Sequence, residues 1–400
     1  MGNLLARVKV RWWLFIARRK RKHQQFAGAL EVLQKMIALQ PRRALAFVEA
    51  GYCLAKLNRH EEALHSYERA LQVASNYGEA HAYIGQAYYD LGRKREALES
   101  LNRAIRMTPS LKDDPYWLHM WGLMNGNAEQ WEQSLEAFTK LTESNRRNGN
   151  AWEGLGWSLA HLNRDSEALA PLQRAIQLDP QSASPHYELG NSYFKLDRFK
   201  EAVEQFQEYI RLKPNDPAGH YALGMTHCEL EEWGLALEPI SKALSLGPEF
   251  ADIYFTLGSI HAQLSQKEDA ARAYRNAVRL DPGNSEAYLY LGWALHEPGT
   301  LEEAAVAYLK SLELKPGQLE AVANLGDAYL QMGQSEMAKN ALADAGKINS
   351  GDSRLHHGLG ELYLKLGMRE EAIREHETLR QLDSSLADDL AKLLDAPPNS

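Results

Sequence analysis

Cysteine is scarce in this sequence of 400 residues, where only Cys53 and Cys228 occur. Disulfide frameworks need a much higher density of cysteines, so we expect two reduced, buried thiols and a reducing compartment. No hydrophobic run approaches the roughly 20 residues that a membrane-spanning helix requires. The apolar stretch from Trp12 to Ala17 is also shorter than the core of a secretory signal. We therefore expect a cytoplasmic protein.

The sequence also lacks a recognisable arrangement of catalytic or metal-binding residues. His356 and His357 are direct neighbours, as are His227 and Cys228, so the two members of each pair point to different faces of a helix. A metal site needs ligands that converge on one point, for example at helical spacing on one face. No nucleophile, base and orienting group stand in a known pattern either. We expect no enzyme activity, no metal and no cofactor.

What the sequence does contain is a repeat of about 34 residues that occurs eleven times between Val10 and Leu386. A glycine marks one position of ten units, and Ala17 takes that position in the first. These glycines are Gly51, Gly85, Gly122, Gly156, Gly190, Gly224, Gly258, Gly292, Gly326 and Gly360. Twelve residues after each there is an alanine or, once, a serine (Ser134). A period of this length predicts stacked helical hairpins.

Proline ends most of the units, as at Pro41, Pro180 and Pro316. Its missing N–H and its ring stop a helix, so each unit is predicted to be a helix, a tight turn and a second helix. The turn position favours glycine or asparagine, which tolerate a left-handed backbone. The residues at that position are Asn58, Gly92, Asn163, Gly299, Gly333 and Gly367.

This pattern resembles the tetratricopeptide repeat family. Units of that family carry an aromatic residue, a Leu-Gly pair, a hydrophobic residue, and then Ala, an aromatic residue, a small residue and Pro. The unit from Ser285 to Gln318 has all of them in that order: Tyr288, Leu291, Gly292, Leu295, Ala304, Tyr308, Ser311 and Pro316. The resemblance implies an all-α fold, a right-handed α-solenoid superhelix of antiparallel helix pairs.

The repeat register also predicts the organisation of the chain. A basic N-terminal segment over residues 1–9 precedes a solenoid over residues 10–386, and a capping helix with a tail follows over residues 387–400. The eleven units start at residues 10, 44, 78, 115, 149, 183, 217, 251, 285, 319 and 353. The leucines of the last segment recur at helical spacing, which indicates an amphipathic helix that covers the final repeat.

One insertion, residues 112–114, breaks the phase of the repeats. In the unit that follows, Asn125, Gly126 and Asn127 stand where the first helix should finish. We predict a shortened first helix and a longer connection there. The alternative is a hinge, because weaker contacts between neighbouring units loosen a one-dimensional array.

In this family the first helices of the units form the inner, concave wall, and the resemblance gives the residues that line it here. Large aromatic side chains are frequent among them. They are Tyr52, Tyr83, Tyr89, Trp157, Tyr187, Phe194, Tyr221, Phe255, Tyr290 and Trp293. Aromatic residues supply contact area to partners with little loss of rotamer entropy. The alternative for each of them is packing between adjacent repeats.

The charge of the same wall is mainly acidic, with twelve acidic residues against four basic ones from Glu49 onward. Some of the acids stand near helix N-termini, where the helix dipole accounts for them. Candidates for contact with a partner are Glu153, Glu188, Glu229, Asp327 and Glu361. An acidic, aromatic groove predicts a basic or apolar peptide or protein segment as the ligand.

Residues 1–22 have the opposite character, with eight basic residues and no acidic one, although the whole chain carries a net charge of −8. The basic residues are Arg7, Lys9, Arg11, Arg18, Arg19, Lys20, Arg21 and Lys22, and Trp12 lies among them. One interpretation is an interfacial helix on anionic lipid. Another is the first helix of a capping unit, because Trp13 and Ala17 are in phase with the repeat. A third is a head-to-tail contact in which this end enters the acidic groove of a second copy.

The sequence therefore predicts a non-enzymatic scaffold or adaptor that holds a peptide or protein segment in its concave groove. A membrane-surface adaptor that docks through the basic N-terminus and a self-assembling scaffold are the alternatives. Nucleic acid is not an expected partner, because the chain beyond residue 22 is acidic and would repel phosphates.

Overall fold

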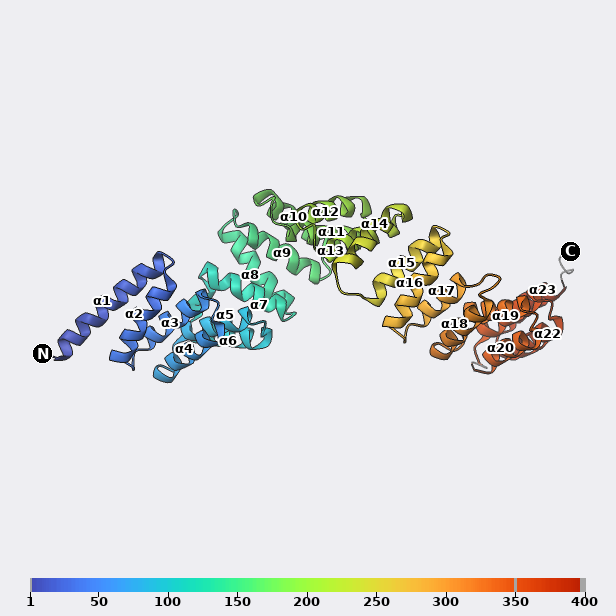
Figure 1. Ribbon diagram of the computed structural model, residues 1–400, viewed down its shortest axis with the longest axis horizontal. Helices are drawn as coiled ribbons and strands as arrows, with labels where there is room; N and C mark the ends of the chain where they lie inside the picture. The colour runs from blue at the N-terminus through green and yellow to red at the C-terminus, as the bar shows by residue number, and fades with distance from the viewer. Residues whose placement is uncertain (1, 349–350, 396–400) are drawn as a thin grey trace. The chain divides into compact units, whose positions relative to one another are not determined.

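The computed structural model describes residues 2–348 and 351–395, with only the backbone described for residues 2–8 and 346–348. Across these residues the structure contains 23 α-helices, one short 3-10 helix and no strand. The chain divides into two compact units, Met1–Leu212 and Lys213–Ser400. Figure 1 shows each unit as a series of helix pairs that follow one another in chain order. The all-α fold class of antiparallel helix pairs is confirmed.

The first unit consists of six helix pairs. Their helices are α1 (Gly2–Lys22), α2 (Phe26–Leu39), α3 (Ala44–Lys56), α4 (His60–Val73), α5 (Gly78–Asp90), α6 (Lys94–Met107), α7 (Pro115–Asn127), α8 (Trp131–Ser144), α9 (Gly149–His161), α10 (Asp165–Leu178), α11 (Ser184–Lys195) and α12 (Phe199–Leu212), with the 3-10 helix η1 (Pro109–Lys112) between α6 and α7. Each helix packs against the next one in the chain.

The second unit consists of five helix pairs and a terminal helix. Its helices are α13 (Pro217–Glu229), α14 (Trp233–Leu246), α15 (Ala251–Gln263), α16 (Lys267–Leu280), α17 (Ser285–Ala294), α18 (Leu301–Leu314), α19 (Leu319–Gln331), α20 (Ser335–Ile348), α21 (Ser353–Lys365), α22 (Arg369–Leu382) and α23 (Ser384–Asp395). The terminal helix α23 packs on both α21 and α22 and buries Ala387, Leu390 and Leu394. It begins three residues before the predicted position, and Ala396 lies outside the described residues.

The fixed glycine of most repeats lies directly against a residue of the second helix of its pair. At Gly292 a Cβ atom would lie 2.6 Å from the nearest ring atom of Tyr308, and Tyr308 is fully buried. Gly258 has the same relation to Tyr274, at 2.7 Å. Glycine at this position lets the second helix of the pair place a large residue directly beneath the first helix.

The turn within each pair adopts the predicted left-handed backbone. Asn58 has a φ of 59°, Gly92 of 74° and Asn163 of 57°, and Gly333 and Gly367 follow the same pattern. The same conformation also occurs at residues whose side chains gave no signal for it: Gln24, Glu129, Asp197, Glu231 and Ser265. The turn is therefore determined by the packing of the pair more than by the residue at its corner.

The prediction of a shortened first helix after the insertion is wrong. Helix α7 has 13 residues, as do most first helices. The side-chain amide of Asn125 is buried and donates to the carbonyl of Trp121 at 2.7 Å. A Cβ atom on Gly126 would lie 2.3 Å from the ring of Trp157, so this glycine serves close packing and does not break the helix. The inserted residues are absorbed by η1 and the turn after it.

The first helix that is shortened is α17, with ten residues. His296, Glu297 and Pro298 follow it in a longer loop, where Gly299 has a φ of 103°.

Both cysteines are unpaired, and the prediction of two buried thiols holds for Cys53 only. Cys228 is half-buried. Burial raises the pKa of each thiol to about 11, which keeps both in the unreactive protonated form at neutral pH. In the described part of the chain no helix is long and apolar enough to cross a membrane.

Candidate functional site

All ten aromatic candidates lie on first helices of their pairs, from α3 to α17. None of them is buried: nine side chains are half-buried, and Tyr290 is 36% exposed. Each one therefore combines contacts within the protein with surface that a partner can reach. Tyr52 and Tyr83 belong to one row in the first unit, and Phe255, Tyr290 and Trp293 lie together in the second unit, whereas the other candidates pack against separate partners.

The group in the second unit forms a hollow, which we refer to as the aromatic hollow. The rings of Phe255, Tyr274 and Tyr290 contact one another with centroid distances of 5.7–5.9 Å. Together with Trp293 they line a cavity of about 370 Å³ between α15 and α17. Its polar lining comes from Ser259, Gln263, Glu286 and Glu320.

The acidic residues of the aromatic hollow raise the pKa of Tyr290, one of its tyrosines. Glu286 and Glu320 are exposed. Burial raises the pKa of the Tyr290 hydroxyl, and the charges of Glu320 and Glu286 raise it further. The ammonium group of Lys267 lies 5.8 Å from the centre of the Trp293 ring and pairs with Glu297 at 2.9 Å. One face of Trp293 thus already carries a cation, which is an arrangement that a ligand cation can also adopt.

In the first unit an aromatic row follows α2, α3, α5 and α7. The ring of Tyr52 contacts Phe26 at 6.4 Å and Tyr83 at 5.9 Å, and Tyr83 contacts Trp117 at 5.2 Å. These contacts join neighbouring repeats, so the row contributes to packing along the first unit. The hydroxyl of Tyr89 accepts a hydrogen bond from Asn127 at 3.2 Å.

Further along the first unit, Trp157 packs against Trp131 at 4.8 Å and Tyr187 against Tyr209 at 5.0 Å. Phe194 packs against Phe199 at 5.4 Å. These side chains pack within their own part of the array and still keep part of each ring at the surface. Tyr221, in the second unit, packs with the cluster of Ile240 and Ile253.

The acidic candidates differ in their surroundings. Asp327 accepts hydrogen bonds from Gln331 at 2.7 Å and shares a contact of 2.9 Å with the Nε2 atom of His296, so it already has partners within the protein. Glu229 on α13 is exposed, and Glu361 on α21 is half-buried. Burial raises the pKa of Glu188 to about 7, the charge of Glu153 adds to this, and Lys195 opposes it. Glu153 on α9 and Glu188 on α11 therefore repel each other when both carboxyl groups are charged.

The raised pKa of Glu188 gives a prediction about pH. The folded state holds the proton of Glu188 more tightly than the unfolded chain, so protonation of Glu188 stabilises the fold. This stabilisation is complete below the ordinary pKa of glutamate. It is lost as the pH rises through about 7. We expect Glu188→Gln to flatten the fall in stability between pH 5 and pH 8, by on the order of 1–3 kcal/mol. Urea unfolding at both pH values measures this, with Glu204→Gln on the exposed side of α12 as the control. Parallel pH profiles for the wild type and Glu188→Gln would contradict it.

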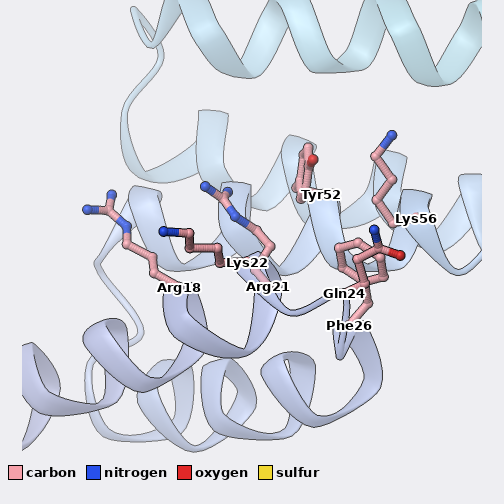
Figure 2. Close-up of a pocket in the computed structure, with 7 residues that line it drawn as sticks. All are labelled: Arg18, Arg21, Lys22, Gln24, Phe26, Tyr52 and Lys56. Carbon is pink, nitrogen blue, oxygen red and sulfur yellow. The ribbon is translucent and has the colours of Figure 1, made fainter.

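At the N-terminal end the wall is basic and not acidic. Arg18, Arg21, Lys22, Gln24, Phe26, Tyr52 and Lys56 line a cavity of about 670 Å³, which we refer to as the N-terminal hollow (Figure 2). Four of these seven side chains are cationic. The predicted acidic groove is thus not uniform along the first unit. The signal was present in the repeat register, because α1 carries its arginines at the same repeat positions that line the wall in later units.

The other basic residues of α1 lie outside the N-terminal hollow. Lys9, Arg11 and Arg19 are exposed, Lys20 is half-buried, and the side chain of Arg7 lies outside the described part. Trp12 and Phe15 are 60% and 55% exposed, and their rings stack with a centroid distance of 5.8 Å. Helix α1 is continuous from Gly2, so the structure shows no break between residues 2–9 and the first repeat.

Among the residues that the structure describes, no group of three histidine, cysteine, aspartate or glutamate side chains is arranged to hold a metal ion.

Comparison with known sequences identifies the repeats. Profiles described as tetratricopeptide repeat match residues 42–110, 255–318 and 295–357, and a profile described as TPR repeat matches 156–197 and 190–231. A search of curated proteins finds no match to the chain.

Solved structures also resemble the chain. The TPR protein YrrB, described as having an unusual peptide-binding site, is 25% identical with a TM-score of 0.42, over 46% of this chain and 96% of its own. MamA from Desulfovibrio magneticus is 24% identical with a TM-score of 0.40, over 42% and 96%. A tetratricopeptide repeat protein from Parabacteroides merdae is 16% identical with a TM-score of 0.47, over 63% and 98%.

Four observations point to the same family: the period of the repeat, the glycine that packs against a large residue, the hairpin turns and the sequence profiles. This chain belongs to the tetratricopeptide repeat family, whose members are protein–protein interaction scaffolds.

Proposed function

We propose that the protein is a non-enzymatic scaffold that binds a peptide or protein segment along the first helices of its repeats. In the second unit, the ligand segment is basic or apolar and its anchor site is the aromatic hollow. The observation that carries this proposal is the coincidence of three features in the hollow: a cavity, a partly exposed aromatic cluster and an acidic rim.

Each feature contributes a different part of the binding. The rings of Tyr290 and Trp293 offer rigid apolar surface that a ligand side chain can cover, and such aromatic anchors usually dominate the binding energy. Glu286 and Glu320 are exposed, so they act mainly through long-range attraction of a basic segment. Tyr290 and Trp293 also accept a cation on their faces, as Lys267 already shows for Trp293.

A selection from a random peptide library on the full chain tests the proposal. We expect the selected peptides whose binding depends on Tyr290 to be enriched in lysine, arginine and apolar residues. Glu286→Gln with Glu320→Gln should weaken the best peptide roughly 3- to 10-fold at low salt, and less at high salt, because exposed charges are screened.

The matched control for this pair is Glu268→Gln with Glu302→Gln, which removes the same charge from exposed positions on the second helices α16 and α18. Equal weakening by both pairs would show that only the net charge of the protein attracts the peptide. Selection of acidic peptides whose binding depends on Tyr290 would also contradict the proposed ligand.

A further inference from the structure

Two arginines of the N-terminal hollow pair with one carboxylate that is almost completely buried. Glu49 is 7% exposed and accepts from Nε of Arg18 at 3.2 Å and from Nη1 of Arg21 at 2.6 Å. A guanidinium group has five N–H donors, and each of these contacts uses one of them. Glu49 therefore fixes the two arginines in position, while the side chains of Arg18 and Arg21 stay 53% and 34% exposed.

Two of the cations also lie close to the ring of Tyr52 on α3. The guanidinium of Arg21 lies 4.8 Å from the centre of the Tyr52 ring, and the ammonium of Lys56 lies 5.7 Å from it. Figure 2 shows Tyr52 between these two side chains, with Lys22 beside Arg21 and Arg18 beyond it. The charged ends form a row and do not converge on a single point. Four cations and one shielded carboxylate leave the hollow strongly positive.

A row of cations fits a ligand that carries several anionic groups along its length. Phe26 and Tyr52 add apolar surface between the charges. The hollow also adjoins a smaller cavity of about 30 Å³, which shares Tyr52 and Lys56 and continues toward Tyr83, Gln86 and the acidic Asp90 on α5. The site is thus continuous with the wall formed by the next first helix, along which an extended segment could run.

We infer that the N-terminal hollow binds a run of acidic side chains in an extended segment of a partner protein. This inference rests on the proposed function and adds the orientation of the bound segment along the repeats. The acidic part of a ligand lies at α1 and α3, and basic residues that follow lie nearer the Glu153 and Glu188 pair on α9 and α11 of the same unit. The ligand of the first unit is accordingly a peptide with charges of both signs, separated along its sequence.

The test uses a labelled hexaglutamate peptide with an acetylated N-terminus and an amidated C-terminus, so that no terminal carboxylate is present. Fluorescence anisotropy with the full chain at low salt measures its affinity. We expect binding that Arg21→Gln with Lys56→Gln weakens at least 10-fold, and no comparable binding of hexaglutamine. The control is Arg95→Gln with Lys140→Gln, two exposed cations on the second helices α6 and α8, which should change the affinity less than 2-fold.

Several results would overturn the inference. These are absence of hexaglutamate binding to the wild type, equal loss in the control pair, or equal binding of hexaglutamine. Binding to vesicles with 30% phosphatidylserine that needs Arg21 and Lys56, with no peptide binding, would assign the hollow to lipid. Self-association that the same two substitutions abolish and hexaglutamate does not inhibit would assign it to a second copy. Selection of basic peptides at the aromatic hollow is independent of all these outcomes, so failure here leaves the proposed function to its own test.

Discussion

Replacing Gly292 with alanine is expected to lower the free energy of unfolding by about 2–3 kcal/mol, which is a large effect for one methyl group. The added Cβ atom would meet the ring of Tyr308 at 2.6–2.9 Å. Tyr308 is fully buried, and its hydroxyl contacts His296 at 3.1 Å, so the ring has no room to move away. The two helices of this pair would have to separate, and hydrogen exchange in α17 and α18 should become faster.

Gly326 provides a matched control at the same position of the next repeat. There the nearest atom to an added Cβ is Cδ1 of Leu342 at 3.4 Å, an ordinary contact. We expect Gly326→Ala to be neutral or to stabilise by up to about 1 kcal/mol, because alanine favours a helix over glycine. Chemical unfolding followed by circular dichroism compares the two variants. If both cost the same, the close approach of Tyr308 is not what requires glycine at position 292.

The second large effect is expected for binding. Tyr290→Ala with Trp293→Ala should weaken the peptide selected on the wild type roughly 100-fold or more, since each aromatic anchor in such a site contributes on the order of 2 kcal/mol. Both side chains lie at the surface of the aromatic hollow and not in the buried core, so the helix content should remain. Titration calorimetry measures the affinity, and circular dichroism checks the fold.

Tyr254 on α15 offers the control for this variant, because it is a tyrosine of the same unit whose hydroxyl contacts Glu249 on the exposed surface at 3.1 Å. Tyr254→Ala should leave the affinity within about 2-fold, which is the effect expected of a residue outside the contact region. An undiminished affinity of the Tyr290 and Trp293 variant would place the peptide elsewhere on the molecule.

Much of the fold could be predicted because the repeat constrains the same positions many times. The glycine of each unit, the small residue twelve positions later and the proline at the end fix two helices and their turn. What could not be predicted depends on single contacts. Gly126 suggests the end of a helix in the sequence, whereas in the structure it makes room for the Trp157 ring. The left-handed turn at Glu129 or Ser265 has no signal in its own side chain.

The candidate site was predictable to a similar degree. The family register places the aromatic residues on first helices, and the structure brings Tyr290 and Trp293 together with Phe255 and Tyr274. Tyr274 lies on a second helix, so a search confined to the first helices omits it. In the sequence the arginines of α1 stand in a basic terminal stretch, which is typical of a helix on anionic lipid. The repeat register already puts Arg18 and Arg21 at wall positions, and their ion pairs with the buried Glu49 join them to α3.

Photo-crosslinking tests most directly whether the peptide binds at the aromatic hollow, because it locates the bound peptide. Benzoylphenylalanine is introduced in place of Tyr290, on the aromatic hollow, or in place of the half-buried Tyr254, which lies outside the hollow. Each protein is then irradiated with the selected basic peptide. We expect a crosslink at position 290 that unlabelled peptide suppresses, and none at position 254. Crosslinking at position 254 with none at position 290 would show that the first-helix wall of the second unit is not where this scaffold holds its partner.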